Sequence, residues 1–333
     1  MKTVQGLKFL GFYKGNTLDI APSGEFFVKT SRRTISVCDF KSKQVLCQAD
    51  AKDNIVCGIS PDEKHSLFTE KGETRLTVRD ICGLNIVSSI DVERVYFTDF
   101  FSDSEILFLE SCKTEIKCCC WDFVKNEIRV VGAFSRNLKL MPFHNCSNGD
   151  GSISFLCHYD SPKDLFERIS FDNKEVYRES LTVADDTSIE SLQKINNKMI
   201  VCERKGQLNG STCLYDFDTH EKVLLSDKRV AWAFMLSEKL YLLETISEPF
   251  GFGISLIDVS GNELFDFSGI KDLKSATVKN SSNDDYLILR NAYGSFVFKK
   301  CYEPIPDAQL TIPALNCKLP GTEGFRFGKF TIK

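Results

Sequence analysis

Three consecutive cysteines, Cys118-Cys119-Cys120, are the residues whose chemistry stands out first. A thiol cluster suggests metal binding or redox chemistry, and zinc sites usually place cysteines in loops at spacings such as C-x-x-C. That spacing is missing here. Because side chains of a strand alternate between its two faces, we predict that Cys118 and Cys120 pack in a core while Cys119 faces the other way.

Two more groups have the residue types of metal sites. The first is a nominal zinc set. Adjacent residues of a strand point in opposite directions, so we interpret His158 as a strand residue and His144 as a turn residue, with zinc binding as the alternative. The full set is His144, Cys146, Cys157 and His158.

The second group is the turn from Asn148 to Ser152, whose oxygen-bearing side chains alternate as in a calcium loop. The distal glutamate of such a loop is missing, because position twelve is Tyr159. We therefore interpret this segment as a glycine-rich turn that lengthens the chain locally. No metal and no cofactor is expected.

Composition excludes several classes of function. A net charge of −4, from 42 basic and 46 acidic side chains, argues against nucleic-acid binding, which needs a basic excess. No apolar run approaches the roughly 18 residues of a membrane helix, and the N-terminus lacks the apolar core of a signal peptide. We expect a cytoplasmic monomer whose 14 cysteines are mostly reduced and buried.

The chain contains a repeated segment of alternating apolar residues that ends on aspartate. The spacing is about 42 residues, apart from one interval of about 50 in the fourth unit. Together with this segment, each unit contains four strand-like runs bounded by turn residues. This is typical of the blade of a β-propeller. The repeated positions are Asp39, Asp80, Asp122, Asp172, Asp216, Asp258 and, with the aspartate lost, Lys300.

The units resemble WD40-type repeats. Trp121-Asp122 matches the tryptophan–aspartate dipeptide of that family, and Phe171, Tyr215 and Ile257 keep an aromatic or apolar residue before the aspartate. Cys38 and Arg79 depart from the pattern, the Gly-His dipeptide is absent, and 4 histidines cannot supply the family's buried network in most blades. The resemblance implies an all-β, seven-bladed propeller of four-stranded antiparallel blades.

The two ends of the chain are predicted to meet. Leu7–Tyr13 precedes the first unit and is free to complete the seventh blade, so that the N-terminal strand closes the ring. We expect Glu303–Pro306 to break pairing, because proline donates no backbone hydrogen bond. The predicted organisation is a propeller over 1–302 and a C-terminal appendage over 303–333 that packs on it, in which Phe325–Ile332 adds a strand or lies on the rim.

The propeller has two rims of different composition. The rim with the turns between strands one and two and between strands three and four is rich in Asp and Glu, and we call it the acidic rim. The other, the link rim, contains the turns between strands two and three and the links between blades. It carries Arg and loop aromatics, which are enriched in interface hot spots. The candidate partner-binding residues there are Arg32, Arg33, Arg204, Phe250, Phe252 and Tyr293.

The sequence contains no catalytic motif, and the histidines His65, His144, His158 and His220 are scattered. No catalytic residue is therefore predicted. The resemblance to WD40-type propellers implies a non-enzymatic interaction module or scaffold that binds a partner protein on one rim. Two alternatives stay open: a propeller enzyme or small-ligand sensor with its site at the central channel, and a link rim that is merely a solvated mixed surface.

Overall fold

The computed structural model is all-β. It describes residues 3–14, 17–31, 33–51, 54–70, 72–135, 138–140, 146–147, 153–159, 165–171, 176–182, 188–195, 198–205, 209–216, 219, 221–237, 240–247, 251–266, 277–280, 285–291, 294–306, 326–327 and 330–331. Within these residues there is no helix, and hence none long and apolar enough to cross a membrane.

Consecutive strands of the first three units form three four-stranded antiparallel sheets. The first sheet contains β2 (Thr17–Ile20), β3 (Phe26–Thr30), β4 (Thr34–Asp39) and β5 (Val45–Asp50). The second contains β6 (Ile55–Ile59), β7 (His65–Glu70), β8 (Arg75–Asp80) and β9 (Ile86–Asp91). The third contains β10 (Val95–Phe100), β11 (Glu105–Ser111), β12 (Glu115–Asp122) and β13 (Glu127–Ser135).

The second half of the chain repeats this order. The fourth sheet contains β14 (Leu138–Leu140), β15 (Cys146–Ser147), β16 (Ile153–Tyr159), β17 (Leu165–Phe171) and β18 (Val176–Thr182). The fifth contains β19 (Ser188–Ile195), β20 (Lys198–Lys205), β21 (Asn209–Asp216) and β22 (Lys222–Lys228). The sixth contains β23 (Val230–Ser237), β24 (Leu240–Ser247), β25 (Gly251–Asp258) and β26 (Glu263–Asp266).

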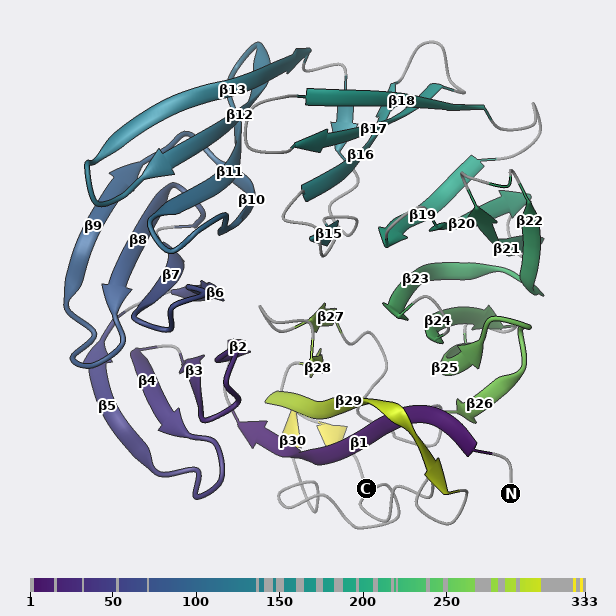
Figure 1. Ribbon diagram of the computed structural model, residues 1–333, viewed down its shortest axis with the longest axis horizontal. Helices are drawn as coiled ribbons and strands as arrows, with labels where there is room; N and C mark the ends of the chain where they lie inside the picture. Colours follow the sequence, from purple (N-terminus) through teal and green to yellow (C-terminus); the bar gives the residue numbers. More distant parts are fainter. Residues whose placement is uncertain are drawn as a thin grey trace.

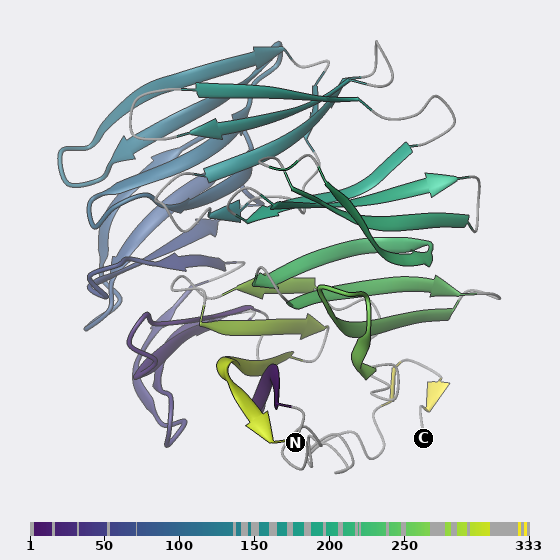
Figure 2. The same cartoon turned by 45° about the vertical axis from the view of Figure 1, so that its right-hand side comes forward.

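The seventh sheet joins the two ends of the chain. It contains β27 (Thr277–Asn280), β28 (Tyr286–Asn291) and β29 (Gly294–Pro306), with β1 (Thr3–Lys14) as its outer strand. The sheets stand around a common centre, with the first strand of each unit inside and the fourth outside (Figures 1 and 2). A last pair, β30 (Arg326–Phe327) and β31 (Phe330–Thr331), forms a separate ribbon.

The core lies between neighbouring sheets, because the second and third strands of the first three sheets bury side chains on both faces. One cluster between the first and second sheets includes Val37 and Phe68, and the next, between the second and third, includes Leu76, Phe108 and Trp121. Trp121, of the predicted Trp-Asp dipeptide, is fully buried. All three cysteines of the triplet are buried too. Cys119 lies on the same face of β12 as Trp121 and belongs to this second cluster.

A further cluster connects the first and seventh sheets through Tyr13, Phe27, Tyr286 and Val297. Gly24 lies at this contact with a φ of 71°, and a Cβ built there would meet the Tyr286 hydroxyl oxygen at 2.2 Å. The pairing of β1 with β29 agrees with the predicted role of Leu7–Tyr13. The number of blades in a closed ring stays a prediction, because it depends on segments outside the described residues.

Two details of the prediction are wrong. The Glu303–Pro306 segment does not end pairing: β29 runs to Pro306, which lies opposite Thr3. Pairing survives because the register shifts between Val4 and Gly6, so residues 302–304 have no opposite partner and the Pro304 nitrogen needs none. The strand thus passes the predicted boundary at residue 302, and the division into propeller and appendage stays a prediction.

The fourth sheet has five strands rather than four. β14 pairs with the end of β16, at Cys157–Tyr159, and β15 pairs with its beginning, at Ile153 and Ser154. Its first strand is therefore divided into two short pieces, which accounts for extra length in this unit. The predicted metal-like residues His144 and Asn148–Ser152 lie outside the described residues, whereas His158 lies in β16 as predicted.

Candidate interaction rim

The repeated aspartates of the acidic rim are used to build turns. The Asp39 carboxylate accepts a hydrogen bond from the Ser42 N–H at 2.6 Å. Asp80 accepts from the Gly83 N–H at 2.6 Å and from the Asn85 N–H at 2.9 Å. Asp122 and Asp258 cap the corresponding turns of the third and sixth sheets. Much of the acidity on this rim is therefore turn chemistry.

These hydrogen bonds favour the charged carboxylates. The Ser42 side chain and N–H lower the pKa of Asp39. Partial burial alone would raise the pKa of Asp80, but the bonds from Gly83 and Asn85 outweigh it, and the pKa is lowered. The Lys125 side chain and N–H lower the pKa of Asp122. Carboxylates held in this way remain ionised and are occupied by their own turns.

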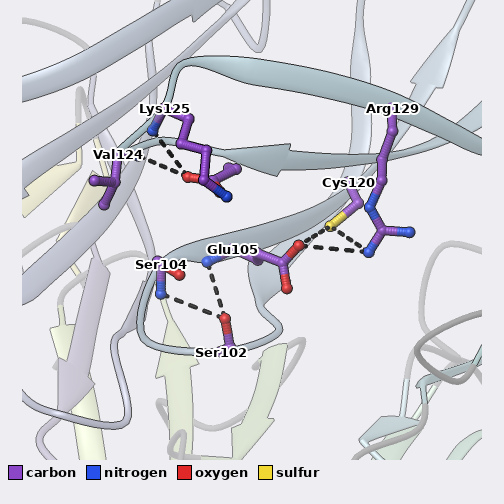
Figure 3. A network of polar contacts seen from close by, with 8 residues as sticks. Ser102, Ser104, Glu105, Cys120, Val124, Lys125 and Arg129 are labelled. Atoms are coloured by element: carbon purple, nitrogen blue, oxygen red, sulfur yellow. Dashed lines mark hydrogen bonds and ion pairs between the residues drawn. The ribbon is translucent and has the colours of Figure 1, made fainter.

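The cysteine triplet takes part in packing and in one surface contact. In Figure 3 the Arg129 Nη2 atom lies 3.5 Å from Glu105 Oε1 and 3.4 Å from Cys120 Sγ. Burial raises the pKa of Cys120 to about 11 and that of Cys119 to about 12, so both remain protonated thiols. Within the described residues no group of three or more His, Cys, Asp or Glu is placed to hold a metal ion.

The link rim is held together by backbone hydrogen bonds between neighbouring sheets. The turn between β7 and β8 accepts two backbone hydrogen bonds: from Val95 N–H, at the start of β10, to the Glu73 carbonyl at 2.9 Å, and from Val92 N–H, in the link before β10, to the Thr74 carbonyl at 3.0 Å. Ser111 N–H donates to the Arg94 carbonyl at 2.8 Å. Arg94 is thus fixed from two sheets, and its side chain projects from a rigid backbone.

Arg94 and Tyr96 form an exposed aromatic–guanidinium pair. The Arg94 guanidinium carbon lies 5.6 Å from the centre of the Tyr96 ring, and Arg94 Nε lies 3.6 Å from Glu73 Oε2. The register shifts between Val95 and Phe97, so Tyr96 is a bulge residue on the innermost strand, and 42% of it is exposed. A bulge redirects a side chain out of the regular pleat. Folding does not require an exposed aromatic ring there.

Ile55 is a second exposed apolar residue, at the start of the first strand of the neighbouring sheet. It begins β6, whose residues contact β10, and it is 39% exposed. Among the first strands of the first three sheets, whose side chains the structure describes, Ile55 and Tyr96 are the exposed large apolar residues; the others of this kind in the described part of the chain lie on outer strands or in turns. Arg33, in the turn between β3 and β4, adds an exposed cation on the same rim. We call Arg33, Ile55, Glu73, Arg94 and Tyr96 the link-rim patch.

The structure describes only part of the predicted partner site. Arg33 is exposed, whereas Arg204 is half-buried near the end of β20, opposite Ser188. Phe252 lies near the start of β25, opposite Ile246. Arg32, Phe250 and Tyr293 lie outside the described residues, so their role stays a prediction. Tyr96 was not among the predicted candidates, because a bulge on a first strand has no clear sequence signal.

Comparison with known proteins supports the fold. No protein family and no curated protein sequence matches the chain. Among solved structures, it is similar to the β-propeller domain of Cps50 (Swd1) from Myceliophteria thermophila, with a TM-score of 0.60 and 10% identity over 88% of this chain and 99% of that one. It is also similar to the N-terminal domain of Nup159, with a TM-score of 0.54 and 11% identity over 90% and 96% of the two chains.

An oligogalacturonate lyase from Vibrio parahaemolyticus is similar as well, with a TM-score of 0.61 and 13% identity over 92% of this chain and 93% of that one. At such low identity these similarities establish the fold alone. Together with the four-stranded antiparallel sheets, they show that the chain has a β-propeller fold. Because an enzyme is among the similar structures, the fold does not decide between binding and catalysis.

Proposed function

We propose that this protein is a non-enzymatic interaction module that binds a partner protein through the link-rim patch. The observation that carries the proposal is Tyr96, an exposed aromatic side chain on a bulged inner strand, with the Arg94 guanidinium held against its ring. Tyr and Arg are among the residues that contribute most to binding energy at protein interfaces. The backbone around them is already fixed, so little ordering is needed when a partner binds.

The patch suits a partner that offers an apolar anchor and a carboxylate. Tyr96 and Ile55 would contact the apolar side chain, and the exposed Arg33 and Arg94 would pair with the acid. The existing Arg94–Glu73 ion pair is largely solvent-exposed, with 62% and 43% of the two side chains accessible. Exposed pairs contribute at most about 1 kcal/mol, so a partner's carboxylate can replace Glu73 at small cost.

The test is affinity capture from cells, comparing the wild type with the double variant Arg94→Glu, Tyr96→Ala. A matched control, Lys64→Glu with Val124→Ala, removes one cation and one exposed apolar side chain from the acidic rim. We expect a partner that the wild type and the control recover and the link-rim variant loses. A partner lost only with the control variant would place the site on the acidic rim and overturn the proposal.

A further inference from the structure

Cys82 differs from the other cysteines in its exposure. Of the cysteines whose side chains the structure describes, it is the exposed one, while the rest are buried or half-buried. It lies in the turn between β8 and β9 of the second sheet. Gly83 N–H donates to Asp80 Oδ1 at 2.6 Å, and Leu84 N–H donates to the Asp80 carbonyl at 3.0 Å. These bonds hold the Cys82 backbone in a defined position at the surface.

A second thiol reaches this turn from the neighbouring sheet. Cys47 lies on β5, the outer strand of the first sheet, and its Sγ atom is 3.2 Å from the carbonyl oxygen of Ile81. Cys47 packs against the cluster that contains Ile81 and Leu84. Figure 1 shows the same arrangement, with the β8–β9 turn beside β5.

The geometry permits a bond between the two sulfurs. The Ile81 carbonyl and the Cys82 Cα belong to one planar peptide unit, in which these two atoms are about 2.8 Å apart. The Cys47 sulfur is therefore at most about 6 Å from the Cys82 Cα. Cys47 Sγ and Cys82 Cα are thus close enough for the two side chains to approach, and a disulfide would require the two Cα atoms to lie about 4.4–6.8 Å apart. Closing it needs a rotation of the Cys47 side chain that gives up its hydrogen bond to the Ile81 carbonyl.

We propose that Cys47 and Cys82 are an oxidation-sensitive thiol pair, which closes to an inter-blade disulfide when the protein meets a hydroperoxide. The exposed Cys82 thiolate attacks the peroxide, the O–O bond breaks, and Cys82 becomes a sulfenic acid. The Cys47 sulfur then attacks the Cys82 sulfur, the S–S bond forms, the S–O bond breaks, and hydroxide leaves with the thiol proton as water. With hydrogen peroxide, two thiols and one peroxide give one disulfide and two waters.

The order of the two steps follows from the surroundings of each thiol. Burial, with Asp80 and Cys82 nearby, raises the pKa of Cys47, and its sulfur donates to the Ile81 carbonyl. Cys47 therefore stays a protonated thiol during the first step and reacts in the second. Cys82 reacts first, because solvent reaches it directly. The closed disulfide would join the first sheet to the second at the outer edge of the molecule, away from the link-rim patch.

The experiment treats the purified protein with hydrogen peroxide, alkylates the remaining thiols and digests with trypsin without reduction. Tryptic fragments 44–52 and 80–94 contain one cysteine each, so a linked mass identifies the bond without ambiguity. We expect this linked pair to form in the wild type and in a Cys57→Ser control, and to be absent in Cys82→Ser. Cys82 oxidised to sulfinic or sulfonic acid while Cys47 stays free would overturn the proposal.

Thermal unfolding of the peroxide-treated protein gives a second readout. A bond between residues 47 and 82 restrains the unfolded chain, so the peroxide-treated wild type should unfold at a midpoint about 5 °C higher. Dithiothreitol should reverse the shift, and Cys82→Ser should show none. A linked pair that leaves the midpoint unchanged would contradict the restraint between the two sheets.

Discussion

Replacing Trp121 with alanine removes the largest fully buried side chain of the described core. The indole packs between the second and third sheets, with the Phe123 ring centroid 6.3 Å away, and its Nε1–H lies 3.4 Å from Asn126 Oδ1. Truncating a buried Trp or Phe to alanine typically costs about 3–5 kcal/mol, through lost transfer energy and the cavity left behind. Loss of a weak hydrogen bond adds at most about 1 kcal/mol.

We therefore expect the free energy of unfolding of Trp121→Ala to fall by about 3–5 kcal/mol, a large share of the about 5–15 kcal/mol of an ordinary domain. Urea denaturation followed by circular dichroism measures it, and an unchanged slope shows that the midpoint shift reflects stability. Val124→Ala, three residues along and 69% exposed, should stay within about 0.5 kcal/mol. A loss below about 1 kcal/mol for Trp121→Ala would refute the packing described between these sheets.

Three further outcomes follow from the same contacts. The pKa values of Asp39, Asp80 and Asp122 are lowered in the folded protein from an ordinary 3.8, so these carboxylates stabilise the fold above about pH 4. This stabilisation is lost as the pH falls through the folded-state pKa values. The unfolding midpoint should drop in that acidic range, and less steeply in Asp80→Asn. Deleting residues 1–13 removes most of β1 and the buried Tyr13 and leaves β29 as an open edge, so light scattering should show aggregation and the midpoint should fall; wild-type behaviour would contradict the closure. The variant Arg94→Glu, Tyr96→Ala should unfold within about 0.5 kcal/mol of the wild type, since both side chains are exposed; a larger loss in urea would make them part of the fold.

The fold could be predicted from the sequence because its turns require particular residues at particular positions. The carboxylate of Asp39, Asp80 or Asp258 accepts backbone N–H groups two to five residues ahead, and Asp122 and Asp216 do the same in the third and fifth units. The consecutive residues before it are buried on both faces of their strand in the first three units, where the strand packs between neighbouring sheets. These are local constraints, and a single sequence displays them.

Features that depend on register were not predictable in the same way. Tyr96 is exposed because β10 contains one residue more than its partner there, a choice decided by pairing rather than by residue type. Pro304 was misjudged for the same reason, since a shift in the β1–β29 register removes the need for its N–H. The proximity of Cys47 to Cys82 depends on how two sheets pack, which no spacing along the chain reveals.

Hydrogen–deuterium exchange can show whether a partner protein binds the link-rim patch. The partner recovered by affinity capture would be added to the purified propeller, and amide exchange would be compared with that of the free protein. The account predicts protection in peptides that cover Glu73 and Arg94–Tyr96, with no change in the turns that follow Asp80 and Asp122. Protection confined to those acidic-rim turns, with the link-rim peptides unchanged, would contradict it.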